Sequence, residues 1–140
     1  MYEQIINNIP DAYITQSNIH KKGLFATDKI LAGSCLGYLD GQHMSWERYQ
    51  DMVKKIGDNS EVATLFLEWN ALTENELLVR PFRTKYSFIN HSRTPNVAIR
   101  YNPIRLITLR DILPNEELTL DYRKEPLNKE YLNGHGKTYL

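Results

Sequence analysis

The chain has a single cysteine, Cys35, and this scarcity excludes several kinds of site. An internal disulfide needs two cysteines and a cysteine-rich zinc site needs several, so the sequence can form neither. The four histidines are scattered through the chain without the spacing of metal ligands. The sequence therefore indicates no metal site, and its chemistry has to come from other side chains.

Net charge and long apolar runs are also lacking. Seventeen basic residues balance 17 acidic ones, so no overall field attracts nucleic acid or an anionic membrane. No run reaches the length of a membrane-spanning helix, and the first residues lack the basic start and apolar core of a secretion signal. The 140 residues suffice for one hydrophobic core. We therefore expect a soluble, intracellular protein, cytoplasmic or nuclear, with no direct nucleic-acid or membrane partner.

The charges are unevenly placed along the chain. Residues 40–76 contain eight acidic and three basic side chains, whereas residues 80–110 contain seven basic side chains and no acidic one. Two interpretations stay open. The two sections can be solvated faces that neutralise each other, or the acidic section can receive a basic peptide, because interfaces favour complementary charge.

Two polar clusters stand at the ends of residues 86–122. The first is Asn90-His91-Ser92, followed by Pro95-Asn96, and the second runs from Glu116 to Tyr122. Between them, apolar runs at 97–101 and 104–109 flank Asn102-Pro103, which predicts a hairpin that can bring the clusters together. The simpler alternative is a pair of polar turns at the ends of a hairpin, since Asn and Ser readily bond local backbone groups.

The rest of the chain predicts short strands and one main helix. The helix begins after the N-cap Ser45, carries Trp46, Tyr49, Val53 and Ile56 on one face, and stops at residues 57–59. Its aromatic residues favour a role in the core over a role as a ligand cage. Strands are expected at 12–15, 24–30, 35–39, 62–69 and 77–79, with Asp40-Gly41 as a hairpin-type turn and 73–76 as another. Residues 1–11 form a loosely held lead-in.

The order Asn-His-Ser-x-x-Pro-Asn, about twenty residues and then Glu-Glu-Leu-Thr-x-Asp-Tyr resembles the SET domain of protein-lysine methyltransferases. Gly23-Leu24-Phe25-Ala26 and the later Gly33 extend the resemblance upstream. It implies a mainly β fold with a minor α part: short curved sheets, one main helix and a C-terminal pseudo-knot, in which the segment ending at Tyr122 threads beneath a loop. The domain would span residues 12–123 with a variable acidic insert at about 42–80, and residues 124–140 would form a tail.

The resemblance implies transfer of methyl groups from S-adenosylmethionine to a lysine of a protein, in a basic segment of that substrate. Two rival hypotheses remain open: a catalytically inactive module that binds a peptide or protein partner, and methylation of a non-protein amine. By resemblance Tyr122 is catalytic, and it also contributes to donor binding. The other residues implied for the donor are Lys22, Gly23, Leu24, Phe25, Asn90 and His91, and those implied for the lysine channel are Leu39, Ile99, Leu120 and Tyr86.

Several positions depart from the family pattern. Lys21 replaces the first glycine of the usual Gly-x-Gly loop, and Leu39, Ile99 and Leu120 stand where aromatic residues are frequent. Leu120 is smaller than Phe and has no hydroxyl to hold a water, so the channel would allow more than one methylation. No cysteine follows Tyr122, so a zinc-bound closing segment is excluded, and Tyr131 or Tyr139 is expected as an apolar lid instead.

Overall fold

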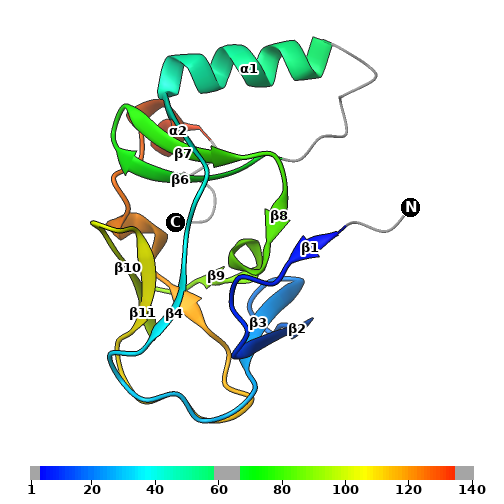
Figure 1. Ribbon diagram of the computed structural model, residues 1–140, viewed down its shortest axis with the longest axis vertical. Helices are drawn as coiled ribbons and strands as arrows, with labels where there is room; N and C mark the ends of the chain where they lie inside the picture. Colours follow the sequence, from blue (N-terminus) through cyan, green and yellow to red (C-terminus); the bar gives the residue numbers. More distant parts are fainter. Residues whose placement is uncertain (1–3, 59–66, 135–140) are drawn as a thin grey trace. The chain divides into compact units, whose positions relative to one another are not determined.

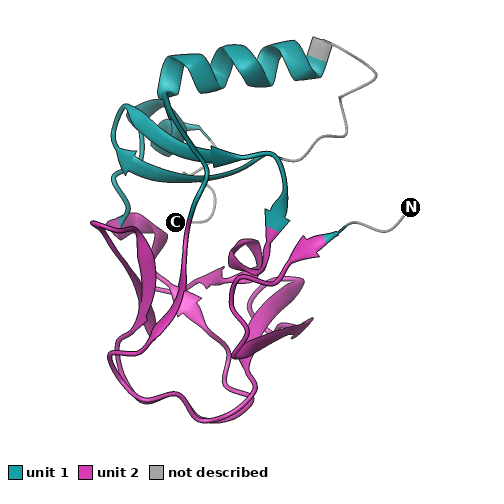
Figure 2. Cartoon of the chain, viewed as in Figure 1, with its two compact units in different colours: residues 1–4, 40–83, 125–140 teal, residues 5–39, 84–124 magenta. Residues whose placement is uncertain are grey.

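The structure is a computed structural model that describes residues 4–58 and 67–134. The chain divides into two compact units, shown in different colours in Figure 2. Unit 1 comprises residues 1–4, 40–83 and 125–140, and unit 2 comprises residues 5–39 and 84–124. The chain is mainly β with one long helix (Figure 1), which confirms the predicted fold class.

Unit 2 is built from short strands and two 3-10 turns. Its elements are β1 (Ile5–Ile6), β2 (Ala12–Gln16), β3 (Lys22–Ala26), β4 (Cys35–Tyr38), η1 (Lys85–Phe88), β9 (Asn90–His91), β10 (Val97–Arg100), β11 (Arg105–Thr108), β12 (Thr119–Leu120) and η2 (Tyr122–Lys124), and β8 (Arg83–Thr84) lies at its border. The strands β2 and β3 pair as an antiparallel hairpin. Five strands form the main sheet in the order β4-β11-β10-β12-β9.

The predicted hairpin is confirmed. Strands β10 and β11 pair antiparallel from Val97 opposite Thr108 to Arg100 opposite Arg105. The turn between them contains Asn102 with a φ of 62°, a left-handed conformation that asparagine tolerates better than most residues. The β-branched residues on both sides favour extended backbone, so local sequence is sufficient to specify this element.

Strand β12 enters the main sheet between two strands that precede it in sequence. It runs parallel to β9, with Thr119 opposite Asn90, and parallel to β10, with Leu120 opposite Val97. The backbone N–H of Ser92 also donates to the carbonyl of Leu120 at 3.0 Å. The late segment therefore lies between the strands that flank residues 92–96, which is the arrangement predicted as a pseudo-knot.

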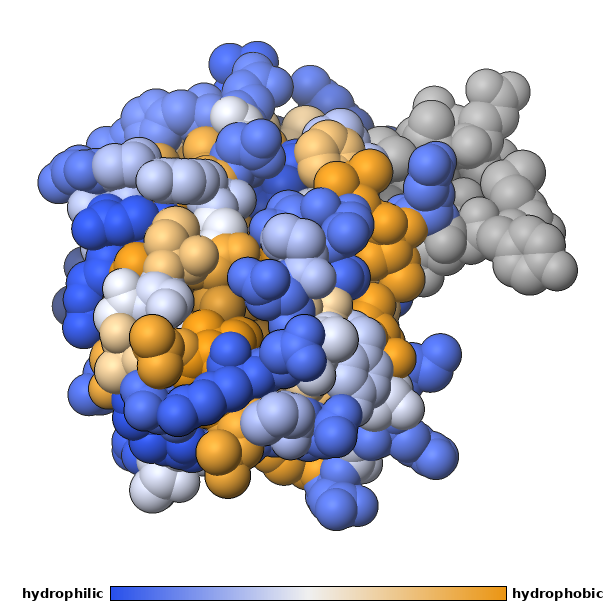
Figure 3. Space-filling view, turned by 60° about the horizontal axis from the view of Figure 1, so that its bottom comes forward, coloured by the Kyte–Doolittle hydropathy of each residue, from blue (hydrophilic) through white to orange (hydrophobic). Residues whose placement is uncertain are grey.

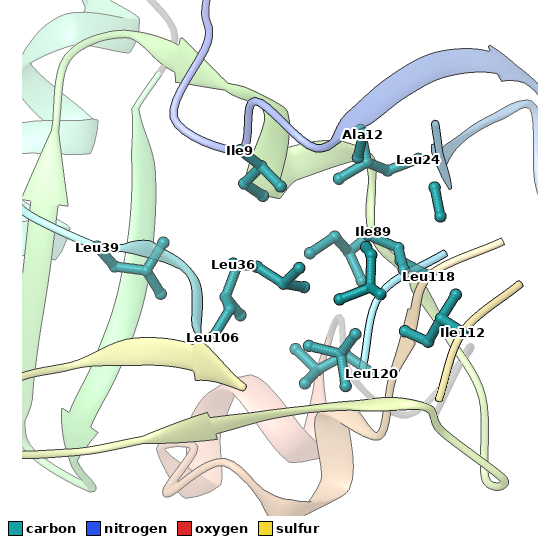
Figure 4. Packing of buried hydrophobic residues seen from close by; sticks show 13 residues of the cluster. Ile9, Ala12, Leu24, Leu36, Leu39, Ile89, Leu106, Ile112, Leu118 and Leu120 are labelled. Atoms are coloured by element: carbon teal, nitrogen blue, oxygen red, sulfur yellow. The ribbon is translucent and has the colours of Figure 1, made fainter. Parts of the chain in front are cut away.

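The core of unit 2 is aliphatic and continuous. Figure 4 shows ten of its labelled side chains, all buried: Ile9, Ala12, Leu24, Leu36, Leu39, Ile89, Leu106, Ile112, Leu118 and Leu120. Ile9 has no solvent exposure, and its carbonyl accepts from Lys85 Nζ at 3.2 Å. The structure therefore differs from the expectation of a loosely held lead-in, because residue 9 contributes a whole side chain to the core.

Unit 1 is a three-stranded sheet with two helices. Its elements are β5 (Gln42–Ser45), α1 (Trp46–Asp58), β6 (Glu68–Thr73), β7 (Glu76–Arg80) and α2 (Lys129–Asn133), and the sheet order is β5-β7-β6. The predicted N-cap is confirmed, because Ser45 Oγ accepts from the N–H of Arg48 at 3.1 Å. The small core contains Met44, Ala71, Leu77, Val79 and Leu127.

A buried ion pair lies in the sheet of unit 1. Arg80 Nε donates to Glu68 Oε1 at 2.6 Å, and the two side chains are 1% and 5% exposed. Arg80 also donates to the side chain of Asn70 at 2.8 Å and to the carbonyl of Asp40 at 2.9 Å. Glu68 is therefore buried and neutralised within unit 1, so the acidic section presents less negative charge to a partner than its sequence indicates.

Two local expectations differ from the structure. Asp40-Gly41 is not a hairpin turn, because β4 pairs with β11 and β5 pairs with β7 in a different sheet. The strands on either side of Asp40-Gly41 pair with strands that are distant in the sequence, and a turn dipeptide cannot indicate such partners. The strand expected at 62–69 begins at Glu68, and residues 62–66 of that prediction lie outside the described residues. The predicted domain boundaries remain predictions.

The surface mixes polar and apolar side chains. The face shown in Figure 3 carries several hydrophobic groups separated by hydrophilic ones. Within residues 4–58 and 67–134, no helix has the length and apolar character needed to cross a membrane. Over the same residues, no three His, Cys, Asp or Glu side chains gather where they could hold a metal ion.

Candidate functional site

The hairpin of β2 and β3 is joined to the second polar cluster by backbone hydrogen bonds. The N–H of Leu118 donates to the carbonyl of Leu24 at 2.8 Å, and the N–H of Ala26 donates to the carbonyl of Glu116 at 2.9 Å. Phe25 and Glu117 form an antiparallel bridge. The three separated sequence motifs therefore meet in unit 2, with β9 supplying Asn90 and His91 beside β12.

The side-chain amide of Asn90 is surrounded by acceptors. Its Nδ2 donates to Glu117 Oε2 at 2.8 Å, to Ser17 Oγ at 3.2 Å, and to the carbonyls of His20 and Lys22 at 3.2 Å. Since carboxylate and carbonyl oxygens only accept, the amide nitrogen must face them. Among the described residues, no donor reaches Asn90 Oδ1, which leaves this oxygen available to a ligand.

Glu117 is a site residue for which no role was predicted from the sequence. Both of its carboxylate oxygens accept from Ser17 Oγ, at 2.8 and 2.9 Å. A Cβ placed on Gly23 would lie 2.3 Å from Glu117 Oε2 and 3.1 Å from Asn90 Nδ2. A side chain at position 23 would therefore displace the carboxylate of Glu117 from its place beside Asn90. We call Ser17, Gly23, Asn90 and Glu117 the Asn90 cluster.

The loop before Gly23 has a backbone conformation that favours glycine. Lys21, at the position where glycine was expected from the family pattern, has a φ of 39°. Only a few per cent of non-glycine residues adopt positive φ. The carbonyl of Lys21 accepts from the N–H of Ser17 at 2.9 Å, which closes the loop in spite of the side chain. The Gly-to-Lys departure thus changes the residue while the left-handed turn is kept.

Asn96 connects the two polar clusters. Its Nδ2 donates to the carbonyl of Glu117 at 2.8 Å, and its Oδ1 accepts from the N–H of Thr119 at 2.8 Å. The side chain is 2% exposed, so these bonds are shielded from water. From the sequence, Asn96 was interpreted only as a turn former. Its position six residues after Asn90 in the first motif was the available signal.

His91 and Tyr122 hold each other in place. His91 Nδ1 accepts from the backbone N–H of Tyr122 at 3.0 Å, and the two rings lie 5.1 Å apart. A neutral ring that accepts at Nδ1 carries its proton on Nε2. Nε2 of His91 is buried and has no hydrogen-bond partner among the described residues. The Tyr122 hydroxyl donates to the carbonyl of Ile89.

Two carboxylates beside the site are held in the charged form. Hydrogen bonds from Arg123 lower the pKa of Asp121 to about 2, against an opposing effect of burial. Both guanidinium bonds are short, at 2.8 and 2.9 Å. The side-chain hydrogen bond from Arg110 likewise lowers the pKa of Glu116 to about 2. These pairs fix the chain on both sides of Glu117 and Tyr122.

The four residues expected in a lysine channel lie in or against the aliphatic core of unit 2. Leu39 and Leu120 are buried at 5% and 3% exposure, and Ile99, Tyr86 and Tyr122 pack partly buried against the same core. Figure 4 shows Leu36 and Leu106 between Leu39 and Leu120. Leu120 directly precedes Asp121 and Tyr122 in the sequence. In space, Leu36 and Leu106 separate it from Leu39 (Figure 4). Their role as channel walls remains a prediction.

The chemistry of the Asn90 cluster favours a cationic ligand group. The free Oδ1 of Asn90, the carboxylate of Glu117 and the carbonyls of residues 20 and 22 are all acceptors. Such a set stabilises an ammonium group, which offers several N–H donors and a positive charge. A family model described as SET domain matches residues 21–123 of the chain. A comparison with curated proteins gave no match.

Proposed function

Because the chain belongs to the SET domain family, we propose that it transfers methyl groups from S-adenosylmethionine to lysine side chains of a protein substrate. The observation that carries this proposal is the joining of all three sequence motifs around the Asn90 cluster, with Tyr122 fixed beside His91. We propose S-adenosylmethionine as the methyl donor, a lysine amine as the acceptor, and a role for each residue of the site.

The residues of the site fit the proposed donor. The donor's amino-acid end carries an ammonium group, and the acceptor-rich Asn90 cluster suits it. Asn90 would accept through Oδ1, and Glu117 would supply the opposite charge. The buried Nε2 of His91 lacks a partner among the described residues, so a hydrogen-bond acceptor on the adenine would satisfy it. Lys22, Gly23, Leu24 and Phe25 would lie along the donor through their backbone.

When bound, S-adenosylmethionine would supply an electrophilic methyl group: the lone pair of an uncharged lysine amine would form the N–C bond as the C–S bond breaks. The sulfur would leave as the neutral thioether of S-adenosylhomocysteine, and the methylated ammonium could then release a proton to water. Tyr122 donates its only hydroxyl proton to the carbonyl of Ile89, so toward a further group its phenolic oxygen can act only as an acceptor. That oxygen can accept from a lysine N–H or from a polarised methyl C–H. Its role is to orient the two reacting groups rather than to remove a proton.

The lysine must lose its proton before it reacts, since an unperturbed lysine with a pKa near 10.4 is almost fully charged at pH 7. Apolar surroundings lower that pKa, and the predicted channel residues Leu39, Ile99, Leu120 and Tyr86 are apolar or aromatic. Leu120 leaves more room than an aromatic ring would. We therefore keep the prediction of more than one methyl group per lysine.

The substrate would present its lysine in a basic segment. Asp40, Glu47, Asp51 and Glu74 are exposed carboxylates of unit 1 and belong to the acidic section, from which pairing with Arg80 removes Glu68. Complementary charge of this kind raises association rates more than affinity. It also predicts that methyl transfer weakens as salt increases.

The second candidate is an inactive module that binds a peptide or partner. Leu39 and Leu120 support it, because both are packed in the core where the family often has aromatic channel residues. Calorimetry with S-adenosylmethionine, followed by transfer of labelled methyl groups to a lysine-rich basic peptide, separates the candidates. Donor binding with transfer supports the enzyme. Absence of both supports the inactive module and refutes the proposed activity.

A further inference from the structure

Unit 1 contains a cavity of about 750 Å³ bordered by α1, β6 and α2. Four aromatic rings line it: Trp46, Tyr49, Trp69 and Tyr131. The two rings of α1, Trp46 and Tyr49, were expected in the core. Like Trp69 and Tyr131, they are only partly buried and pack against the aliphatic core of the unit. Val53, on the same face of α1, is 42% exposed. The aromatic face of α1 therefore forms the wall of a cavity.

The other three rings stand at different angles to Trp69. The ring centroids of Trp46 and Trp69 are 6.2 Å apart, with an interplanar angle of 70°. The ring centroids of Tyr131 and Trp69 are 5.3 Å apart, with an interplanar angle of 90°. Tyr49 lies 6.0 Å from Trp69 at 54°. Rings that are turned against one another present both edges and π faces around a shared space, unlike a flat stack. A π face carries negative charge density and attracts cations.

A carboxylate is fixed beside the rings. Glu130 Oε2 accepts from Trp46 Nε1 at 3.3 Å and from Gln50 Nε2 at 3.1 Å, and Glu130 lines the cavity. Both donors are neutral. In the part of the chain that the structure describes, no Lys, Arg or His forms an ion pair with Glu130. Its negative charge therefore remains available to a ligand.

The position of Glu130 is set by its helix. Asn128 caps α2, because its Oδ1 accepts from the N–H of Glu130 at 2.9 Å. The Nδ2 of the same residue donates to the carbonyl of Glu74 at 2.9 Å, in the turn between β6 and β7. The first residue of α1 is tied to the same turn by the bond from the N–H of Trp46 to the carbonyl of Asn75, at 2.8 Å. The turn between β6 and β7 therefore fixes the start of α1, which carries Trp46, and the start of α2, which carries Glu130.

From this geometry we propose that the cavity binds the methylated ammonium group of a modified lysine in a protein segment. Methyl groups make the cation bulky and poorly hydrated, so aromatic faces can replace its water at low cost. An unmodified lysine ammonium is strongly hydrated and loses more on entering such a cavity. Glu130 supplies the counter-charge. This inference rests on unit 1 alone and does not require the transferase activity.

Two observations favour a lysine side chain over a small free ammonium compound. The cavity volume is several times that of a trimethylammonium group, so a ligand with a stem and a backbone uses more of it. Lys54 of α1 also lines the cavity and is itself a butylammonium chain beside the rings. Its positive charge borders the cavity and disfavours a cationic ligand there. Lys54→Gln is therefore expected to tighten binding of the methylated ligand.

Fluorescence gives a direct test, because the chain has two tryptophans and both line the cavity. The full chain, without donor, is titrated with a short peptide carrying one trimethyl-lysine. Matched titrations use the unmodified peptide, a peptide whose trimethylammonium is replaced by an uncharged tert-butyl group, and tetramethylammonium chloride. We expect the trimethylated peptide to bind at least about tenfold more tightly than the first two. The tryptophan emission should change as the cavity fills.

Equal affinity for the modified and unmodified peptides, or for the charged and uncharged forms, would overturn the proposal. If tetramethylammonium alone bound as tightly as the trimethylated peptide, the assignment to a lysine side chain would be refuted in favour of a small ammonium ligand. Glu130→Gln, at an exposed position, should weaken binding about threefold, whereas Asp28→Asn removes the same charge from an exposed position in unit 2 and should leave binding unchanged. Identical affinities for these two variants would also count against the site.

Discussion

Replacing Tyr122 by phenylalanine removes one hydroxyl and keeps the ring. The ring stays against His91, and the backbone N–H of residue 122 still donates to His91 Nδ1. What is lost is the bond to the carbonyl of Ile89. A neutral hydrogen bond contributes about 0.5–1.5 kcal/mol. We therefore expect the free energy of unfolding to fall by about 1 kcal/mol and the melting temperature to fall by roughly 3–5 °C.

The effect on methyl transfer should be larger than the effect on stability. If the phenolic oxygen orients the lysine amine and the methyl group, its loss raises the barrier and leaves donor binding nearly unchanged. A loss of at least about tenfold in turnover corresponds to about 1.4 kcal/mol of barrier. Single-turnover transfer from labelled donor to a saturating lysine peptide measures this, and donor calorimetry measures binding.

Tyr38→Phe provides the matched control, because Tyr38 is 62% exposed in unit 2 and lies outside the site. Its turnover and melting temperature should equal those of the parent. A folded Tyr122→Phe protein with parental turnover would remove Tyr122 from the mechanism. It would also favour the inactive binding module.

Four further perturbations test the site and its surroundings. Asn90→Ala should weaken donor binding by about 1.5–3 kcal/mol, since Oδ1 would contact a charged group; an unchanged dissociation constant would refute this. Glu117→Gln retains the shape but loses the charge, so donor affinity should fall about tenfold by calorimetry, and parental affinity would exclude the counter-ion role. The native pKa of Asp121 is lowered to about 2 from 3.8, so its stabilising effect is present above pH 3.8 and is lost as the pH falls toward 2. Denaturant titrations should show this acid-side loss shrinking in Asp121→Asn, and an identical slope would contradict it. Asp51→Lys, on the exposed face of α1, should raise the KM for a basic peptide at low salt without changing donor affinity, and equal kinetics would leave the acidic section as a solvated surface.

The sequence predicted those elements whose formation depends on neighbouring residues alone. The β10–β11 hairpin follows from two β-branched runs around Asn102-Pro103, and the start of α1 follows from the hydroxyl of Ser45. The Asp40-Gly41 prediction was wrong because the strand after it pairs with β7, whose residues lie more than thirty positions later. Turn dipeptides carry no information on such distant partners.

The motifs located the site, but they did not show which side chains carry its hydrogen bonds. Asn90 and His91 were expected there and are held beside β12. The partnership of Glu117 with Ser17 joins residues one hundred positions apart, and the second motif alone does not indicate it. The aromatic residues of α1 were expected in the core because helical periodicity identifies an apolar face. It does not show whether that face is covered.

The place of β12 in the main sheet orders the events by which the protein folds. During synthesis β9 and β10 leave the ribosome before residues 119–120, so neither strand has its shared neighbour until those residues have emerged. Asn90 can meet Glu117 only after that late segment has arrived, and closing contacts over such sequence distances is slow. Until then the two strands expose unpaired edges, which are prone to pair with other chains. A nascent chain stalled before residue 119 would therefore carry Asn90 and His91 but lack β12 and Tyr122, so the site could not assemble.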